Sequence, residues 1–289
     1  MNGTGVPLAT PFDEDGDVCE DRLRQLTAAL ERRGVDFFVP CGSNSEAALM
    51  SVEERATVTK IVADEADGQI IAGTGHPGFR ESLRQTELAA EGGADAALVV
   101  TPFYHVHDQD RLAAYYRDLA DESPIPIYLY SVPKYTGVRL DPGTVGTLAT
   151  HENVAGMKDS SGDLDALQRI ATATADADFD LLVGSGSIYG AGLQVGASGG
   201  VLALANVAPE GASGIHRRYA DGDVAGALAL NRDLVALNHA VTAEYGVPGL
   251  KAAMKERGLP AGEPRRPLRP VDAEVAAELA GLVEDAGLD

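Results

Sequence analysis

The fold is best inferred from the segment Asn153-Val-Ala-Gly-Met-Lys-Asp-Ser-Ser-Gly-Asp163. A short apolar run ends there in one lysine, Lys158, and then breaks into small polar residues, which is typical of a buried strand followed by a loop. A lysine amine withdrawn from water can attack a ketone and form a Schiff base. The alternative is that the side chain of Lys158 reaches out to solvent. The other lysines lie on helix-like stretches or in loops, where lysine is usually a solvated charge: Lys60, Lys134, Lys251 and Lys255.

Similar apolar runs recur along the chain at a spacing of roughly 25–35 residues and alternate with amphipathic stretches. The runs are apolar throughout, as parallel strands buried on both faces require. One amphipathic stretch, Val52–Ala66, begins after Ser51-Val-Glu-Glu54, which has the form of a capping box. Eight strand–helix units predict a closed (β/α)8 TIM barrel. The expected strands are Val6–Ala9, Val35–Pro40, Gln69–Gly73, Ala96–Thr101, Ile125–Tyr130, Val154–Lys158, Leu181–Gly184 and Gly200–Ala205, and the other expected helices are Glu20–Arg33, Glu81–Glu91, Gln109–Ala120 and Leu164–Thr174.

The pattern changes near Tyr219, after which helices follow one another without strands. We expect three of them, Asp221–Asn238, Val247–Arg257 and Asp272–Ala286, with Asp272 as the N-cap of the last. The proline-rich segment Gly258–Pro270 is expected to be a linker. The sequence therefore predicts an α/β protein with a TIM barrel catalytic domain over 1–220 and a C-terminal helical extension over 221–289.

The composition is strongly acidic, with 44 Asp and Glu against 23 Lys and Arg and a formal net charge of −21. This excess is spread over the whole chain, which argues against nucleic-acid binding and is typical of proteins that work in concentrated salt. Cys19 and Cys41 form no CxxC pair, so a reducing cytoplasm is the expected location. No run approaches the roughly 18 apolar residues of a membrane-spanning helix, and the first residues show no export signal.

Polar residues gather where the expected strands end, and in a TIM barrel these ends form one mouth that holds the active site. We therefore expect a hydroxyl-rich site around a lysine. The residues at the strand ends are Thr10, Gly42-Ser-Asn-Ser-Glu46, Thr101-Pro-Phe-Tyr-His105, Tyr130-Ser-Val-Pro133, Lys158 and Gly184-Ser-Gly186.

Six motifs in this order make the chain resemble the pyruvate-dependent class I aldolases, the family of dihydrodipicolinate synthase and N-acetylneuraminate lyase. The resemblance runs from Val6 to about Leu259. The motifs are Pro7-Leu-Ala-Thr-Pro-Phe12, Gly42-Ser-Asn-Ser-Glu46, Thr101-Pro-Phe-Tyr104, Tyr130-Ser-Val-Pro-Lys-Tyr-Thr-Gly137, Gly156-Met-Lys-Asp-Ser-Ser-Gly162 and Gly196-Ala-Ser-Gly-Gly-Val201.

The resemblance implies a role for each matching residue. Lys158 would hold pyruvate through a Schiff base, and Tyr130 would relay protons to and from the bound substrate. Ser43 and Asn44 would hold the pyruvate carboxylate, largely through backbone N–H groups. Tyr104 would enter the active site of a neighbouring subunit and complete a Tyr–Ser–Tyr relay in a homotetramer built from dimers. Further substrate contacts are expected from Thr10, Gly184 and Val201.

Departures from the family pattern bear on the substrate. Dihydrodipicolinate synthases usually have an arginine two residues after Val-Pro, where it holds the carboxylate of the aldehyde substrate. Here that position is Tyr135. The residue before it, Lys134, either binds a carboxylate or phosphate or lies free in solvent. The Ser43-Asn44 pair resembles the branch that cleaves 2-keto-3-deoxy sugar acids (2-dehydro-3-deoxygluconate or its 6-phosphate) or 4-hydroxy-2-oxoglutarate.

We therefore expect an aldolase that splits such a small-molecule 2-keto acid into pyruvate and an aldehyde. The alternatives are a condensing synthase of the dihydrodipicolinate type, a Schiff-base hydratase or dehydratase, and a ligand-binding barrel without activity.

Neither a cofactor nor a metal is expected. Gly73-Thr-Gly75-His-Pro-Gly78 matches the glycine pattern of dinucleotide sites, but a proline falls among the glycines and the helix pattern begins only near Glu81. His105 and His107 could be two metal ligands, although no third ligand stands at a matching strand end. A Schiff-base lysine also removes the need for a Lewis acid.

Overall fold

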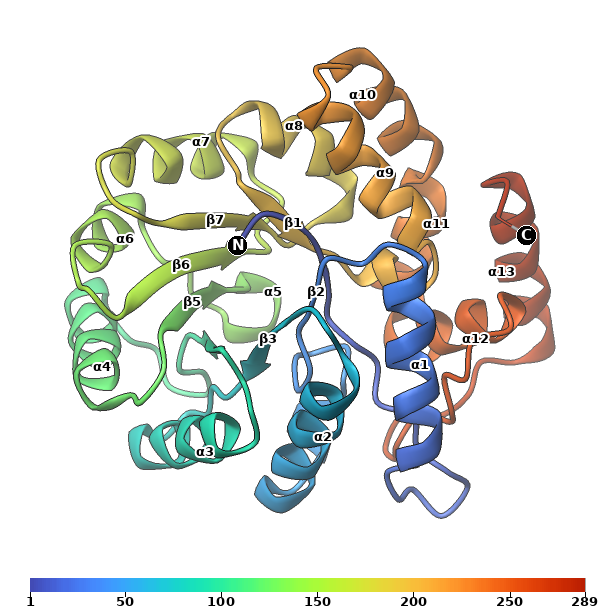
Figure 1. Cartoon of the computed structure of the whole chain (residues 1–289), viewed down its shortest axis with the longest axis horizontal. Coiled ribbons are helices and arrows are strands. Elements are labelled where there is room, and N and C mark those ends of the chain that lie inside the picture. Colours follow the sequence, from blue (N-terminus) through green and yellow to red (C-terminus); the bar gives the residue numbers. More distant parts are fainter. Residues whose placement is uncertain (289) are drawn as a thin grey trace.

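The computed structural model of the chain describes residues 1–288 and shows eight parallel strands closed into a barrel, with helices around it (Figure 1). Neighbouring strands follow chain order, and pairing of Gly3 with Gly199 and of Thr4 with Gly200 closes the ring. The expected TIM barrel is thereby confirmed. The strands are β1 (Gly3–Val6), β2 (Phe37–Phe38), β3 (Gln69–Gly73), β4 (Ala96–Val100), β5 (Ile127–Ser131), β6 (Val154–Asp159), β7 (Asp180–Val183) and β8 (Gly199–Val201).

The barrel interior is a packed core, because alternate residues of each strand point inward. Tyr128 and Tyr130 of β5 both belong to this inner cluster. Tyr128 fits because β6 has a glycine beside it: a Cβ on Gly156 would lie 2.5 Å from the Tyr128 ring. The hydroxyl on this ring donates to Asp180 Oδ2 at 2.5 Å, and the N-terminal ammonium of Met1 pairs with the same carboxylate.

Three strands differ most from the expectation: β2 is limited to Phe37–Phe38 rather than Val35–Pro40, and β1 and β8 are displaced or shortened. β1 occupies Gly3–Val6 rather than Val6–Ala9, and β8 ends at Val201 rather than at Ala205. The apolar residues beyond these strands are buried in loops: the N–H of Ala9 donates to Asn206 Oδ1 at 3.0 Å, and Asn206 ends the 3-10 turn η3 (Ala203–Asn206). Apolar composition predicted burial correctly here, but burial comes from the C-terminal helices packed on η3 and not from strand pairing.

The helices around the barrel begin near the expected residues. The capping box at Ser51 is confirmed, since Ser51 Oγ accepts from the N–H of Glu54 at 3.2 Å and Glu54 Oε2 accepts from the N–H of Ser51 at 2.8 Å. None of the helices within residues 1–288 combines the length and apolar composition needed to cross a bilayer. The helices of this part are α1 (Glu20–Arg32), α2 (Val52–Glu65), α3 (Phe79–Glu91), α4 (Gln109–Glu122), α5 (Pro133–Thr136), α6 (Pro142–Leu148), α7 (Leu164–Ala173), α8 (Tyr189–Gln194) and α9 (Pro209–Ala220), with the 3-10 turns η1 (Ala47–Leu49) and η2 (Gly186–Ile188).

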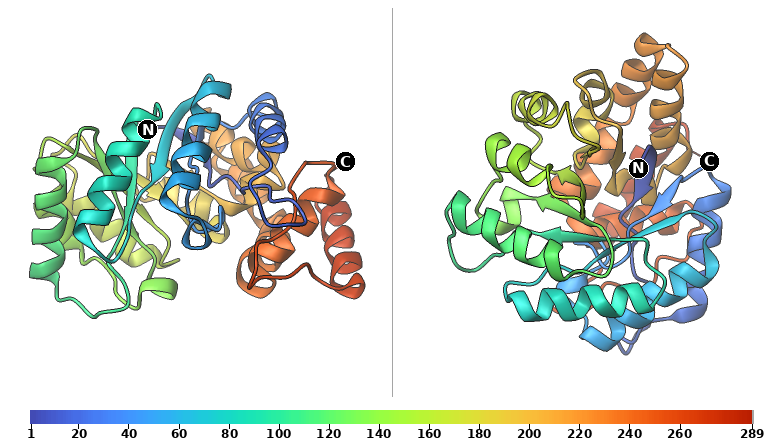
Figure 2. Two further views of the ribbon diagram at one scale, coloured as in Figure 1. Left: turned by 90° about the horizontal axis from the view of Figure 1, so that it is seen from below. Right: turned by 60° about the vertical axis from the view of Figure 1, so that its left-hand side comes forward.

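The last quarter of the chain is helical and lies to one side of the barrel, away from α4 (Figures 1 and 2). The expected helix Asp221–Asn238 is divided at Leu234, and a π-helical segment follows it. Asp272 caps the last helix by accepting the N–H of Val275 at 3.0 Å. The division into a barrel (1–220) and an extension (221–289) stays our proposal. The elements are α10 (Val224–Asp233), α11 (Val235–His239), the π-helix η4 (Ala240–Glu244), α12 (Gly246–Glu256) and α13 (Ala273–Asp285).

Candidate active site

Lys158 lies on β6 with only 5% of its surface exposed, so it does not extend into solvent. It pairs in register with Tyr130 of β5, and its Nζ lies 4.5 Å from the centre of the Tyr130 ring. Among residues 1–288, none forms an ion pair or a hydrogen bond with the Lys158 amine. With no acceptor for it in the described part of the chain, the amine is available to a substrate carbonyl.

The hydroxyl of Tyr130 is in a similar situation. The side chain is 6% exposed and packs in the inner cluster with Val201, the last residue of β8. Within residues 1–288 its hydroxyl has no hydrogen-bond partner, and no bond joins it to Ser43 or Tyr104. A phenol next to the amine, with its own hydrogen-bonding capacity unused, can give and take protons at a molecule bound to the lysine.

The turn Gly42–Glu46 follows β2 and presents backbone donors. The N–H groups of Ser45 and Glu46 bond back to Gly42 O and Ser43 O, both at 3.2 Å, and Ser45 Oγ donates to Leu8 O at 2.5 Å. Within the described chain, the N–H groups of Ser43 and Asn44 have no acceptor. Two free N–H groups in a fixed turn can hold a carboxylate.

Thr10 follows β1 and is 1% exposed, yet its hydroxyl has no partner within residues 1–288. The same is true of Thr101, which follows β4 and is fully buried. Thr101 was expected at a strand end, but its sequence motif predicts no role for it. A buried hydroxyl without a partner is costly, so each of these is a candidate to bond a ligand.

The loops after β6 and β7 are held together closely. The N–H of Gly184 donates to Asp159 O at 2.7 Å, and a Cβ at this position would collide with the Ser160 hydroxyl. The neighbouring loop meets the C-terminal extension, where Asn238 Nδ2 donates to Ser187 Oγ at 2.9 Å. The sequence does not predict this contact of Asn238, because nothing in its helical surroundings indicates that it meets a strand-end loop.

Two further expected residues lie on α5 and are exposed. Tyr135 is 60% exposed, and partial burial together with the nearby Tyr130 raises the pKa of its phenol. The Lys134 amine lies 5.6 Å from the centre of the Tyr135 ring and 3.5 Å from Thr242 O. Lys134 was expected either to bind an anion or to lie free in solvent. Its exposed position agrees with the second interpretation and also leaves it accessible to an anion.

Tyr104 is 90% exposed and does not contact the residues described above. Its φ of +78° is in the left-handed region, which is unusual for a bulky residue and indicates a constrained loop. The neighbouring Val106 is also exposed, at 91%. If Tyr104 belongs to an active site, it is one on another subunit.

One lysine was wrongly expected to be a solvated charge. Lys251, on α12, is 1% exposed and pairs with Glu46 Oε1 at 2.6 Å. Burial lowers the pKa of Lys251 to about 8, and the charge of Glu46 opposes this shift. Lys251 is thus buried and paired, whereas Lys158 is buried and has no ion-pair or hydrogen-bond partner among residues 1–288, a difference expected between a structural lysine and a reactive one.

The chain is similar along almost its whole length to one family of known proteins. The model of the dihydrodipicolinate synthetase family matches residues 1–286. A 4-hydroxy-tetrahydrodipicolinate synthase of Methanothrix thermoacetophila is 38% identical over 283 residues, 98% of this chain and 96% of the relative. An uncharacterized DapA-like lyase of Halobacterium salinarum is 36% identical and covers 100% of this chain and 95% of its own. Chloride-inhibited dihydrodipicolinate synthase from Acinetobacter baumannii, solved with pyruvate, superposes with a TM-score of 0.95 at 31% identity over 100% of both chains.

The expected resemblance to the pyruvate-dependent aldolases is confirmed at the level of the family. The expected branch is not supported, because these relatives are named for the synthase or carry only a general name, and none is named as a sugar-acid aldolase.

Proposed function

Because the chain belongs to the dihydrodipicolinate synthetase family, we propose that it is a carbon–carbon lyase that makes or breaks a bond between pyruvate and an aldehyde through a Schiff base on Lys158. The observation that supports this most directly is the buried, unpaired amine of Lys158 at 4.5 Å from the Tyr130 ring. A lysine buried for stability alone would be paired, as Lys251 is.

The proposed reaction begins when Lys158 Nζ attacks the ketone carbon of pyruvate. The resulting carbinolamine loses water to give an imine, and loss of a methyl proton turns the imine into an enamine. The enamine carbon attacks the aldehyde carbon, whose oxygen takes up a proton, and water then releases the product from the lysine. Tyr130 moves these protons through its free hydroxyl, while the N–H groups of Ser43 and Asn44 hold the pyruvate carboxylate. Thr10, Gly184 and Val201 complete the substrate contacts.

For the aldehyde we propose first the substrate of a 4-hydroxy-tetrahydrodipicolinate synthase, an amino acid that carries an aldehyde group (aspartate semialdehyde). The support is the name of the Methanothrix relative, together with the pyruvate-bound synthase of the same fold. This aldehyde carries a carboxylate, and Lys134 is the cation on α5 that could meet it.

A second candidate is the cleavage of a 2-keto-3-deoxy sugar acid, and one observation favours it. Tyr135 stands where the synthases usually have an arginine, and its phenol lies near Tyr130. A phenol bonds sugar hydroxyls well, but it gives a carboxylate only one neutral hydrogen bond instead of the fork of a guanidinium.

Three assays in high salt separate these reactions. They measure condensation of pyruvate with aspartate semialdehyde, pyruvate release from 2-keto-3-deoxy sugar acids and 4-hydroxy-2-oxoglutarate, and loss of water from a 2-keto acid without cleavage. We expect the first to be fastest. Faster pyruvate release would favour the second candidate, and loss of water alone would identify a dehydratase. No turnover in any assay would contradict the proposed function.

We also propose that the protein is a homotetramer in which Tyr104 serves a neighbouring subunit. Its 90% exposure and constrained backbone support this, because a large aromatic side chain fixed outside its own subunit is typical of an interface. The acidic surface and the Halobacterium salinarum relative support a protein that works in high salt.

A further inference from the structure

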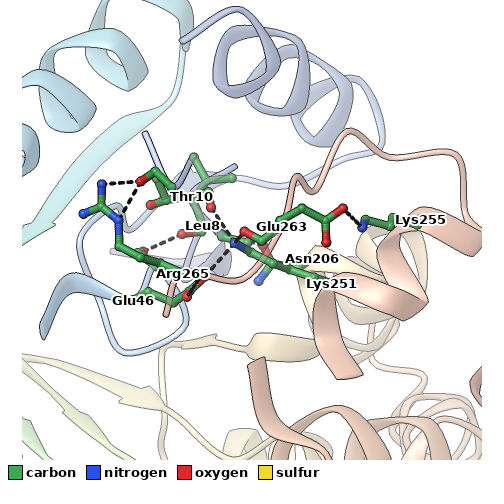
Figure 3. Close-up of polar contacts among 11 residues, drawn as sticks. Leu8, Thr10, Glu46, Asn206, Lys251, Lys255, Glu263 and Arg265 are labelled. Carbon is green, nitrogen blue, oxygen red and sulfur yellow. Dashed lines mark hydrogen bonds and ion pairs between the residues drawn. The ribbon is translucent and has the colours of Figure 1, made fainter. Parts of the chain in front are cut away.

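Lys251 connects the C-terminal helices to the two loops on which pyruvate binding is proposed to depend. Its Nζ donates to Thr10 O at 2.7 Å and to Glu263 O at 2.7 Å, and it pairs with Glu46 Oε1 at 2.6 Å (Figure 3). The ammonium therefore makes two hydrogen bonds to backbone carbonyls and one ion pair to a buried carboxylate. Thr10 belongs to the loop after β1, Glu46 ends the turn after β2, and Glu263 comes from the segment between α12 and α13.

Glu46 is held at both oxygens. Its Oε1 meets Lys251, and its Oε2 accepts the N–H of Arg265 at 2.7 Å. The residue has a φ of +58°, a left-handed conformation that costs free energy for any side chain other than glycine. Because its N–H bonds Ser43 O, this conformation shapes the turn that presents the N–H groups of Ser43 and Asn44.

The ring of Phe12 packs between two cations of the same network. Lys251 Nζ lies 4.7 Å and the Arg265 guanidinium 4.3 Å from its centre. Arg265 also donates to Gly16 O at 2.8 Å and to Leu49 O at 2.9 Å, so it ties the segment before α13 to both loops. The expected linker Gly258–Pro270 is therefore an ordered part of the site's support.

We propose that Lys251 and Glu46 are positioning residues for the pyruvate carboxylate: their ion pair sets the distance between the loop of Thr10 and the turn of Ser43 and Asn44. This inference rests on the proposed function and adds to it a role for the C-terminal extension. Neither residue touches the reacting atoms. The pair acts through the backbone, by fixing the free Thr10 hydroxyl relative to the free N–H groups of the turn.

A buried pair of this kind is a poor source of net stability. Removing one partner strands a buried charge and is strongly destabilising, whereas replacing both by neutral groups of similar shape is often close to neutral. The variant that separates positioning from stability is therefore the double replacement Lys251→Met with Glu46→Gln, in which the glutamine oxygen can still accept the N–H of Arg265. If the double variant is not folded, Glu46→Gln alone is measured instead: it leaves the Lys251 ammonium on the carbonyls of Thr10 and Glu263, and its melting temperature is compared directly with its pyruvate saturation because it removes one partner of a buried pair.

The matched control is Lys255→Met. Lys255 lies one turn further along α12 and pairs with Glu263 Oε1 at 2.6 Å, but its side chain is 43% exposed. The control removes a lysine and an ion pair from the same helix and reaches neither Thr10 nor Glu46.

The experiment uses the whole chain in high salt and measures the borohydride-trapped pyruvate adduct against pyruvate concentration, with no aldehyde present. For the double variant we expect the half-saturating pyruvate concentration to rise about 10- to 100-fold, with nearly the same maximal adduct yield and melting temperature as the wild type. Lys255→Met should match the wild type in all three.

The outcomes are distinguishable. If the wild type traps no pyruvate, the proposed function fails. If the wild type traps it and both Glu46 variants saturate at the wild-type concentration, the positioning role is refuted. If the half-saturating pyruvate concentration rises only in variants whose melting temperature also falls, the pair is a structural element and the proposal is refuted as well.

Discussion

Replacing Tyr130 by phenylalanine removes one hydroxyl at the mouth of the barrel and leaves the ring in place. None of residues 1–288 hydrogen-bonds this hydroxyl, so its loss breaks no bond within the protein, and the free energy of unfolding should hardly change. The proton relay would be lost, and turnover should fall by about 10²–10⁴-fold, the usual contribution of a positioned acid or base.

Tyr128→Phe is the matched control, because Tyr128 lies two residues earlier on β5 and in the same inner cluster. Its hydroxyl donates to Asp180 Oδ2 at 2.5 Å. Burial, and to a smaller extent this hydrogen bond, raise the pKa of the Tyr128 phenol, so the hydroxyl stays protonated and remains a donor. Loss of a hydrogen bond to a charged group should cost about 1.5–3 kcal/mol. For a chain of this length that is a fall in melting temperature of about 3–6 °C, with turnover unchanged.

Steady-state turnover and thermal melts in the same high-salt buffer measure both effects. The expected pattern is opposite in the two variants, with activity lost in one and stability lost in the other. Wild-type turnover in Tyr130→Phe would remove this residue from the mechanism. An equal loss of turnover in Tyr128→Phe would mean that any change to the inner cluster disturbs the site.

Three further predictions follow from the charge and packing of the chain. On transfer from about 1 M to 0.01 M salt the Debye length grows from about 3 to about 30 Å, so subunits that each carry a formal charge of −21 repel one another more strongly. We expect the oligomer to dissociate and activity to fall, and added salt should restore both in part. An unchanged mass by light scattering together with an unchanged rate would refute this. The hydrogen bond from Arg265 lowers the pKa of Glu54, so this carboxylate contributes stability above the unfolded pKa of about 4.3 and loses it as the pH falls through its lower folded value. The difference in unfolding free energy between wild type and Glu54→Gln should therefore shrink in denaturant titrations below about pH 4, and a constant difference would argue against the pair. Gly156→Ala places a methyl group 2.5 Å from the Tyr128 ring. In the same titrations it should lower the free energy of unfolding by about 1–3 kcal/mol. An unchanged free energy of unfolding would show that the side chains inside the barrel move aside without cost.

The local signals of the sequence were sufficient for the barrel and for the burial of Lys158 at the end of β6. Apolar runs at regular spacing predicted the strands, because both faces of a parallel barrel are buried. The capping pattern at Ser51 and the N-cap at Asp272 depend on neighbours three residues away, and both were correct. Lys158 was identifiable because its strand ends in the only cation of that segment.

What the sequence did not predict depends on contacts between distant parts of the chain. Lys251 lies on a largely apolar helix where a lysine would be expected on the solvent side, and its acceptor Thr10 O is 241 positions away. Asn238 meets the loop after β7 across 51 positions. The ends of β1 and β8 were misjudged because Leu8 and Ala205 are fully buried although they lie outside the strands, and hydrophobicity alone does not distinguish a buried loop from a buried strand.

The proposed function depends most directly on a Schiff base between Lys158 and pyruvate. Wild-type protein and Lys158→Ala are incubated with pyruvate and borohydride in high salt, and the modified residue is located by mass spectrometry of the digested chain. We expect one reduced pyruvyl group on Lys158 in the wild type and none in the variant. A group on another lysine, or equal labelling of Lys158→Ala, would contradict it.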